Sequence, residues 1–191
     1  MSETNPVMEF LLNRRSRPAK LLRAPVPDRA ALAPILTAAA RTPDHGKLVP
    51  WRFVVLERGA LSRLADLVEM RGTALGRDPE DIAKARSAYD GSHLAVVVVE
   101  APQTSDNIPE IEQTYSAGAV CLALLNAALA SGWGANWLTG WPVFDRSFVE
   151  TGLGLAPHER VAGVIHIGTA SSTPPDRPRP EVEAITTWMP E

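Results

Sequence analysis

The chain has 191 residues, of which 45% are hydrophobic and 21% charged, and its formal net charge is −3. This composition is typical of a globular protein, and the length predicts a single domain over residues 1–191. The slightly acidic balance offers no basic surface to nucleic acid or to an anionic membrane, so we expect neither as a partner. Cys121 is the one cysteine, which excludes an internal disulfide framework and a cysteine zinc site.

The N-terminal residues show no targeting pattern. MSETNPVMEF lacks a basic region followed by a long apolar core, so we expect no signal peptide. The longest apolar stretch, residues 117–130, is interrupted by Asn126 and is too short to span a bilayer. Together with a single cysteine, which suits a reducing compartment, these features predict a cytoplasmic protein.

The first half of the chain alternates between helical and extended patterns. We expect Pro34, which lies inside the second helix, to kink that helix or delay its start. LAVVVVE is a continuous apolar run, typical of a strand covered on both faces. In chain order the patterns predict a helix over 6–15, a helix over 29–40 capped by Asp28, a strand over 51–57, a helix over 60–71, a helix capped by Asp78 or Asp81 and ending near 88, and a strand over 94–100.

The second half contains one long helix, predicted over 111–131 and ended by Gly132. Its centre, AGAVCLALLNAALA, is apolar nearly all round, so we expect it to be buried on every side. After it we expect a short strand or turn in GANWLTG, a helix from Asp145 to about residue 151, and a buried strand over 161–169. Buried strands that alternate with helices predict an α/β or α+β sheet sandwich. A helix buried all round in so short a chain indicates a subunit interface.

Two groups of cations stand out at the ends of the chain. Arg14, Arg15 and Ser16 lie at the end of the first helix, where cations complement the helix dipole. The same residues could instead clamp a phosphate, because the planar guanidinium matches phosphate oxygens and the serine adds a hydroxyl donor. Arg177 and Arg179 alternate with prolines that hold the backbone extended, so they form either a solvated tail or the second half of the same clamp.

Other familiar sites are not supported by the sequence. The histidines at 45, 93, 158 and 166 form no HxxxH or HExxH pair, so we expect no metal site, and we expect His93 and His166 to be satisfied core residues. No glycine-rich phosphate loop of the Rossmann or P-loop type occurs. Trp133, Trp137 and Trp141 recur every fourth position, which fits core or interface packing or, alternatively, a flat ring ligand nearby.

Taken together, five segments resemble the FMN-dependent nitroreductase superfamily, and most closely its compact YdjA-like branch. The segments are NRRSR, RTPDHGKLVPWRFVVLE, YSAGAVCLALLNAALASGWGANWLTG, VIHIGT and RPRPEVEAITTW. The resemblance implies a central mixed sheet flanked by helices in an intertwined homodimer, with FMN bound at the interface. It implies transfer of two electrons from NADH or NADPH by a ping-pong mechanism to a nitroaromatic or similar small-molecule acceptor. Two alternatives stay open: a reductase of quinones or enones, and a non-catalytic dimer that binds or stores FMN.

The resemblance also assigns the two basic groups. It implies that Arg14 and Ser16 contact the FMN phosphate and ribityl chain, with Arg15 at the pyrimidine side of the flavin. Arg177 and Arg179 resemble the family's C-terminal basic pair, which binds the phosphate. Because the flavin itself exchanges hydride in this family, we expect no catalytic side chain.

The loop RTPDHGKLVPW would reach the flavin of the partner subunit. Arg41 and His45 match family positions that touch FMN, and Pro43 and Asp44 line the turn. Many relatives have two serines and an asparagine in this loop, where Asp44, His45 and Lys47 stand here.

A third segment would lie beside the flavin ring, and Trp137, Leu138 and Thr139 match the residues alongside the isoalloxazine. Lys84 aligns loosely with a position near the carbonyl edge of the flavin. The short segment between the second strand and the long helix implies that the lid helices of larger nitroreductases are missing.

Overall fold

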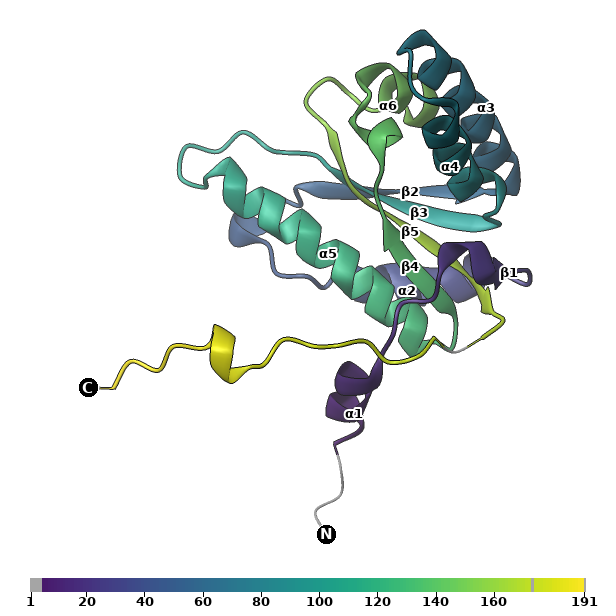
Figure 1. Ribbon diagram of the computed structural model, residues 1–191. Coiled ribbons are helices and arrows are strands. Elements are labelled where there is room, and N and C mark those ends of the chain that lie inside the picture. The colour runs from purple at the N-terminus through teal and green to yellow at the C-terminus, as the bar shows by residue number, and fades with distance from the viewer. Residues whose placement is uncertain (1–4, 173, 191) are drawn as a thin grey trace.

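A computed structural model describes residues 5–172 and 174–190 and shows a sheet between two layers of helices (Figure 1). The helices are α1 (Pro6–Asn13), α2 (Arg29–Ala39), α3 (Arg58–Ala74), α4 (Pro79–Asp90), α5 (Glu110–Ala130) and α6 (Arg146–Leu153). The strands are β1 (Leu22–Arg23), β2 (Trp51–Glu57), β3 (Leu94–Glu100), β4 (Gly134–Leu138) and β5 (Arg160–Ala170). The predicted order of elements is confirmed.

Several helices begin where a polar side chain caps their first turn. Asp28 accepts a hydrogen bond from the Ala31 N–H at 2.8 Å, so α2 begins directly after it and Pro34 does not delay the start. Asp78, rather than Asp81, caps α4. Asp145 caps α6 as predicted.

The sheet has the strand order β1-β5-β3-β2, and β4 also pairs with β5. Within the described residues every strand pair is antiparallel, where the family resemblance implied a mixed sheet. β3 is central, and Val97 pairs with Val54 on one side and Val164 on the other. All seven residues of β3 are buried, which confirms that its continuous apolar run is covered on both faces.

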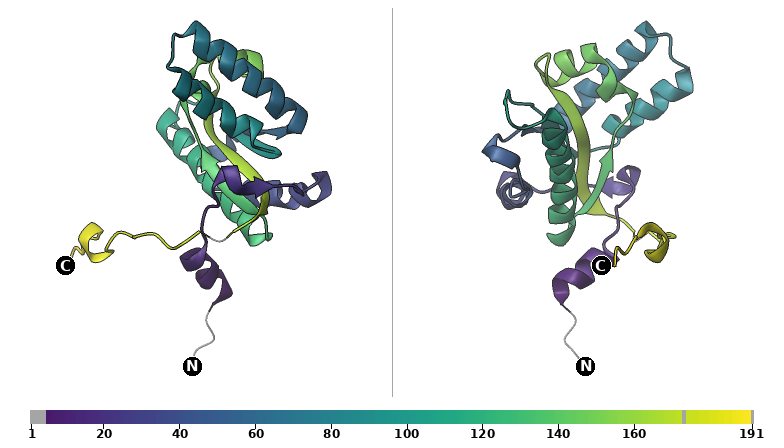
Figure 2. Two further views of the ribbon diagram at one scale, coloured as in Figure 1. Left: turned by 45° about the vertical axis from the view of Figure 1, so that its right-hand side comes forward. Right: turned by 90° about the vertical axis from the view of Figure 1, so that its left-hand side faces the viewer.

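The two faces of the sheet are covered by different helices (Figure 2). Val96 and Val98 pack toward α2 and α5, whereas Val97 and Val99 pack toward α3 and α6. Successive side chains of a strand point to opposite faces, so one apolar run supplies both cores. Each fully buried valine contributes roughly 1.5–3 kcal/mol relative to an exposed one.

The sequence had predicted that α5 is buried on every side. Within one chain it is not. Val120 and Leu124 are buried on the side that faces the sheet. On another side Ile111, Tyr115 and Leu122 are exposed, and Tyr115 has 69% of its surface accessible. By length and hydropathy alone α5 could cross a membrane, but its sheet-facing side makes it a core helix with one uncovered apolar stripe.

The two ends of the chain lie outside the sheet and its layers (Figures 1 and 2). α1 ends at Asn13, two residues earlier than predicted, because Arg14 already has an extended backbone. No residue of α1 is buried. The C-terminal tail extends away from the body and exposes Val182, Ile185 and Trp188. Like the stripe on α5, these side chains leave apolar surface uncovered by this chain.

Candidate functional site

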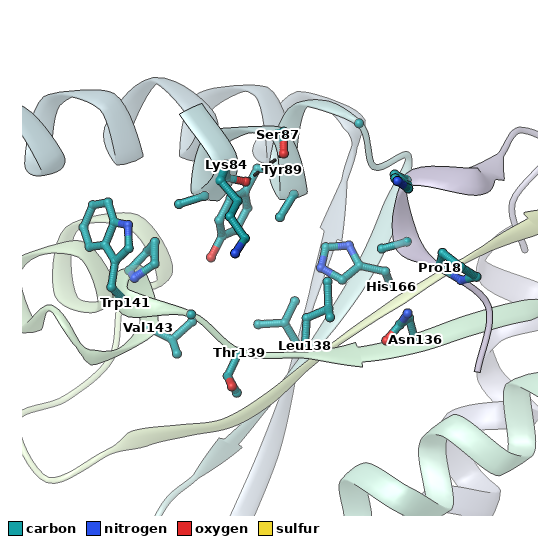
Figure 3. Close-up of a pocket in the computed structure, with 18 of the residues that line it drawn as sticks. Pro18, Lys84, Ser87, Tyr89, Asn136, Leu138, Thr139, Trp141, Val143 and His166 are labelled. Carbon is teal, nitrogen blue, oxygen red and sulfur yellow. Dashed lines mark hydrogen bonds between the residues drawn. The ribbon is translucent and has the colours of Figure 1, made fainter. Parts of the chain in front are cut away.

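A cavity of ≈ 540 Å³ lies between α4 and the strands β4 and β5 (Figure 3). Leu138, Val143 and Trp141 give it apolar walls. Lys84 reaches in from α4, and the ring of His166 reaches in from β5. A mostly apolar space with a few converging polar groups is the usual form of a small-molecule site.

The predicted ring-binding segment divides between the two faces of the sheet. Leu138 and Thr139 line the cavity, as does Asn136. Trp137 does not, because strand side chains alternate and its indole packs on the opposite face, where it covers Gly163. A Cβ at Gly163 would overlap that indole, so the glycine is what admits it. Trp137 is therefore not among the residues that line this cavity.

His166 is a buried histidine with a single hydrogen-bond partner among the described residues. Its Nδ1 lies 2.9 Å from Ser92 Oγ, and Ser92 Oγ donates to the Leu94 carbonyl at 3.3 Å. Burial lowers the pKa of His166 to about 4, so its ring is neutral at pH 7. Burial also raises the pKa of the nearby Tyr89, which stays a phenol.

The arginines that follow α1 line a second depression, of ≈ 590 Å³, between α1 and the start of β4. Arg14 Nη2 donates to Ser16 Oγ at 3.1 Å. Burial lowers the pKa of Arg14, and the charges of Arg179 and Arg15 lower it further. Arg179 comes from the C-terminal tail, so the structure brings cations from both ends of the chain together.

Asp176 is the carboxylate that meets this group. Arg15 Nη1 lies 3.1 Å from it, and Arg179 Nη2 lies 3.8 Å away. Arg15 also donates to the Pro175 carbonyl. The Arg177 backbone N–H donates to Asp176 at 2.8 Å, and its side chain makes no ion pair in the described part of the chain.

Two guanidinium nitrogens in this region lack partners. Arg14 Nε and Arg17 Nη1 are buried and have no hydrogen-bond acceptor among the described residues. A buried charged donor without a partner is costly, so the arrangement favours a bound anion. Arg17, which lines the depression, is bonded to the strand beside the cavity, because Arg17 N–H donates to the Ala135 carbonyl and Asn136 donates to the Arg17 carbonyl, both at 2.8 Å.

The loop after α2 lies elsewhere, against the first turns of α5. The Pro43 carbonyl accepts from Ser116 Oγ at 2.8 Å, and His45 Nδ1 lies 2.7 Å from Glu112. Arg41 is exposed. From Ser116 to the C-terminal end of α5 the helix rises about 20 Å, so the loop is remote from the arginines after α1 in the same chain.

Asp44 has a local structural role that the sequence did not reveal. Its carboxylate accepts from the Leu48 N–H at 3.2 Å and from the Val49 N–H at 2.7 Å. Lys47 and Val49 both have positive φ, at 57° and 49°, which non-glycine residues rarely adopt. The carboxylate therefore holds a strained turn in place. Among the described residues no cluster of three or more His, Cys, Asp or Glu side chains could hold a metal.

The contributions of Tyr89, Asn136 and His166 were missed by sequence reasoning. Alternation along GANWLTG could have placed Asn136 beside Leu138, because both occupy the same face. Nothing in the sequence pairs His166 with Ser92, which lies 74 residues earlier. Only the pairing of β3 with β5 brings these two residues together.

Similar proteins are known at both the sequence and the structural level. The chain is 34% identical over 162 residues to "Putative NAD(P)H nitroreductase YdjA" of Escherichia coli (strain K12), covering 85% of this chain and 87% of the relative. It is 32% identical over 163 residues to "Putative NAD(P)H nitroreductase" of Haemophilus influenzae, with the same coverage.

Solved structures share the fold. A nitroreductase-like family protein from Bacillus cereus superposes with a TM-score of 0.80 at 20% identity, covering 99% of this chain and 98% of that one. A "putative nitroreductase in complex with fmn" from Desulfovibrio desulfuricans gives a TM-score of 0.74 at 21% identity, covering 98% and 99%. The sequence pattern of the Nitroreductase family matches residues 11–169. On this match and the identity to YdjA, the chain belongs to the nitroreductase family.

Proposed function

We propose that this chain is an FMN-dependent NAD(P)H oxidoreductase that passes two electrons to a nitroaromatic or similar acceptor by a ping-pong mechanism. The observation that carries the proposal is the pair of buried, unpartnered guanidinium nitrogens of Arg14 and Arg17, in the segment directly before Pro18, which lines a cavity with apolar walls. A ligand with an anionic group at one end and a flat ring at the other fits both parts. FMN is such a ligand, and when bound it supplies hydride and electron transfer.

The cationic group would hold the phosphate. Arg14, Ser16 and Arg179 lie together, and Asp176 offsets only part of their charge. Charge-assisted hydrogen bonds from guanidinium groups to phosphate oxygens are short and strong. Arg15 is held by Asp176 and Pro175, so its role is to fix the tail beside the site as well as to contribute charge.

The ring would occupy the cavity above β4. Leu138 and Thr139 supply its floor, and Lys84 supplies an ammonium at the side formed by α4. A positive charge beside a flavin favours its reduced, anionic form. No side chain is assigned acid–base or nucleophilic work, so the protein orients the ring and sets its electrostatic surroundings.

A homodimer would cover the apolar surfaces that one chain leaves exposed. The stripe on α5, the exposed α1 and the tail with Val182, Ile185 and Trp188 all need apolar contacts. The loop with Arg41, Pro43, Asp44 and His45 is remote from the arginines of its own chain. It could contribute to a flavin site only across a dimer interface.

The first test is a visible absorption spectrum of the purified protein before and after addition of FMN and desalting. We expect stoichiometric flavin to survive desalting. A protein that remains colourless would refute the proposal. Size-exclusion chromatography with light scattering checks the dimer in the same preparation, where a monomer would contradict the interface.

Steady-state rates separate the remaining alternatives. We expect oxidation of NADH or NADPH that depends on a nitroaromatic acceptor. Faster turnover with quinones or enones would make nitro reduction incidental. Bound FMN with very slow turnover on every acceptor would instead indicate flavin binding or storage.

A further inference from the structure

The ring of His166 presents one unused nitrogen to the cavity. Only 2% of this residue is exposed, and its ring points from β5 into the space above Leu138 (Figure 3). Nδ1 is engaged by Ser92, and Nε2 has no hydrogen-bond partner among the described residues. Since Nε2 is not among the fully buried unpartnered atoms, it opens into the cavity, where a donor on a bound ligand would satisfy it.

The hydrogen bonds of Ser92 decide which nitrogen carries the proton. The Leu94 carbonyl can only accept, so Ser92 must donate its single hydroxyl proton there. With the hydroxyl proton so placed, Ser92 Oγ accepts from His166, and we assign the ring proton to Nδ1 on this basis. Burial without a neighbouring carboxylate keeps the ring neutral, so Nε2 is a bare acceptor.

Opposite this acceptor the cavity carries a donor. Lys84 extends its ammonium from α4 into the same space, and an ammonium can only donate (Figure 3). The cavity thus offers an acceptor on its β5 side and a donor on its α4 side. A cyclic imide edge, in which a ring N–H stands beside carbonyl oxygens, complements such a pair. An apolar ring, or one with only acceptors, would leave Nε2 unpaired.

We propose that His166 is a specificity-determining residue that accepts a hydrogen bond from the imide N–H of the ring held in this cavity. This inference rests on the proposed function, because in FMN that group is the N3–H of the pyrimidine ring. Ser92 acts as a positioning residue, since it fixes the tautomer in which Nε2 can accept. His166 thereby selects rings by a hydrogen bond, whereas the arginines after α1 select by charge.

The test compares FMN with N3-methyl-FMN, in which a methyl group replaces the imide proton. Each is titrated into the apoprotein at neutral pH, and binding is followed by quenching of flavin fluorescence. We expect the unaltered protein to bind N3-methyl-FMN at least about 10-fold more weakly than FMN, because a hydrogen bond is lost and Nε2 is left unpaired. Equal affinities would overturn the inference while leaving FMN binding intact. No binding of either flavin would refute the proposed function itself.

Variants assign the discrimination to one residue. His166→Leu should weaken FMN by about 5-fold and bring the two flavins to nearly equal affinity. His166→Gln, whose side-chain oxygen can reach toward the position of Nε2, should restore part of the preference. Tyr89→Phe removes a different polar group from the same cavity and should keep the full preference. If Tyr89→Phe abolishes it equally, the discrimination belongs to cavity polarity in general and the assignment to His166 is wrong.

The ratio of FMN to riboflavin affinity provides an independent readout. This ratio reports on the cationic group that would bind the phosphate. It should be unchanged in His166→Leu, because His166 acts on the ring alone. A large change in this ratio would mean that the substitution disturbs the whole site, which would count against a local hydrogen bond. If His166→Leu does not fold, His166→Gln and Tyr89→Phe still test the assignment, and equal affinities of the two flavins in the unaltered protein still overturn it.

Discussion

The arginines at the two ends of the molecule differ in how many carboxylate partners they have. Near α3 and α6, Arg52 makes two bonds to Glu159, at 2.6 and 2.7 Å, and Arg71 makes two to Asp145. Near α1 and the tail, Arg15 and Arg179 share one exposed carboxylate, that of Asp176, and Arg14 forms no ion pair within the described residues. We refer to these as the matched end and the unmatched end.

The difference distinguishes charges that stabilise the fold from charges that are available to bind a ligand. At the matched end the arginines lower the pKa of their carboxylates, that of Glu159 to about 2, which is a direct sign of mutual stabilisation. At the unmatched end burial lowers the pKa of Arg14, and the charges of Arg179 and Arg15 lower it further, the latter being a sign of repulsion. A protein retains such repulsion at a site where an anion offsets it. The predictions below test this division.

The largest expected effect is a pH dependence of the free energy of unfolding, caused by His166. Burial keeps this residue neutral, and it has no carboxylate partner. Its pKa is about 4 in the folded protein and 6.5 as a free side chain. Between these values the unfolded chain binds more protons, so the free energy of unfolding decreases as pH falls from 6.5 to 4, by roughly 3 kcal/mol. Chemical denaturation at a series of pH values measures it. In His166→Leu this window should become flat, and persistence of the slope would show that another group causes it.

Substitution of Glu159, at the matched end, should lower the free energy of unfolding by a similar amount. Glu159→Ala removes both bonds to Arg52 and the bond from the Ala156 N–H. Arg52 is partly exposed, so water screens the charge left behind, and we expect a loss of about 2–3 kcal/mol in the free energy of unfolding. Glu159→Gln keeps an acceptor and should lose less.

The same carboxylate also has its own acidic window. Its pKa is depressed from 4.5 to about 2, so the stabilisation is complete above pH 4.5 and is lost as pH falls toward 2.

FMN affinity should not change in either variant of Glu159. A drop in flavin affinity as large as that of Arg14→Ala would break the division between the two ends.

Arg14→Ala tests the unmatched end. We expect FMN affinity to fall by about 1.5–3 kcal/mol, typical of a hydrogen bond to a charged group. The free energy of unfolding of the apoprotein should be unchanged or slightly higher, because a repelled charge is removed. Arg29 is an exposed arginine on α2, so Arg29→Ala serves as the control variant and should change neither FMN affinity nor the free energy of unfolding. Unaltered FMN affinity in Arg14→Ala would remove the phosphate assignment.

Local patterns predicted the fold well. The bounds of β2 and β3 agree with the predicted strands, because β-branched runs between turn residues are a local signal. The caps Asp28 and Asp145 are equally local, since the cap lies within three residues of the N–H it binds. The family resemblance and the arginine-rich segments pointed to the same site.

What could not be predicted depends on contacts between distant segments. Arg15 meets Asp176, 161 residues away, and this pair explains why the tail lies beside α1. The uncovered stripe on α5 was missed because composition does not tell which sides of a helix one chain can cover. Trp137 is absent from the cavity lining because neighbouring strand residues such as Trp137 and Leu138 point to opposite faces.

The smallest effect concerns Asp44, whose carboxylate holds Val49 at a φ of 49°. Asp44→Ala removes the acceptor for two backbone N–H groups and should lower the free energy of unfolding by about 1 kcal/mol, whereas Asp44→Asn should retain part of it. Val49→Gly adopts positive φ without strain, so adding it to Asp44→Ala should recover much of the loss. Denaturation of the two single variants and the double variant gives the coupling between them. Additive effects would show that the carboxylate does not stabilise the strained residue. If the loop also contacts flavin across the dimer, Asp44→Ala should weaken FMN, but by less than Arg14→Ala does, since Asp44 acts there through the shape of the turn and not through charge on the phosphate.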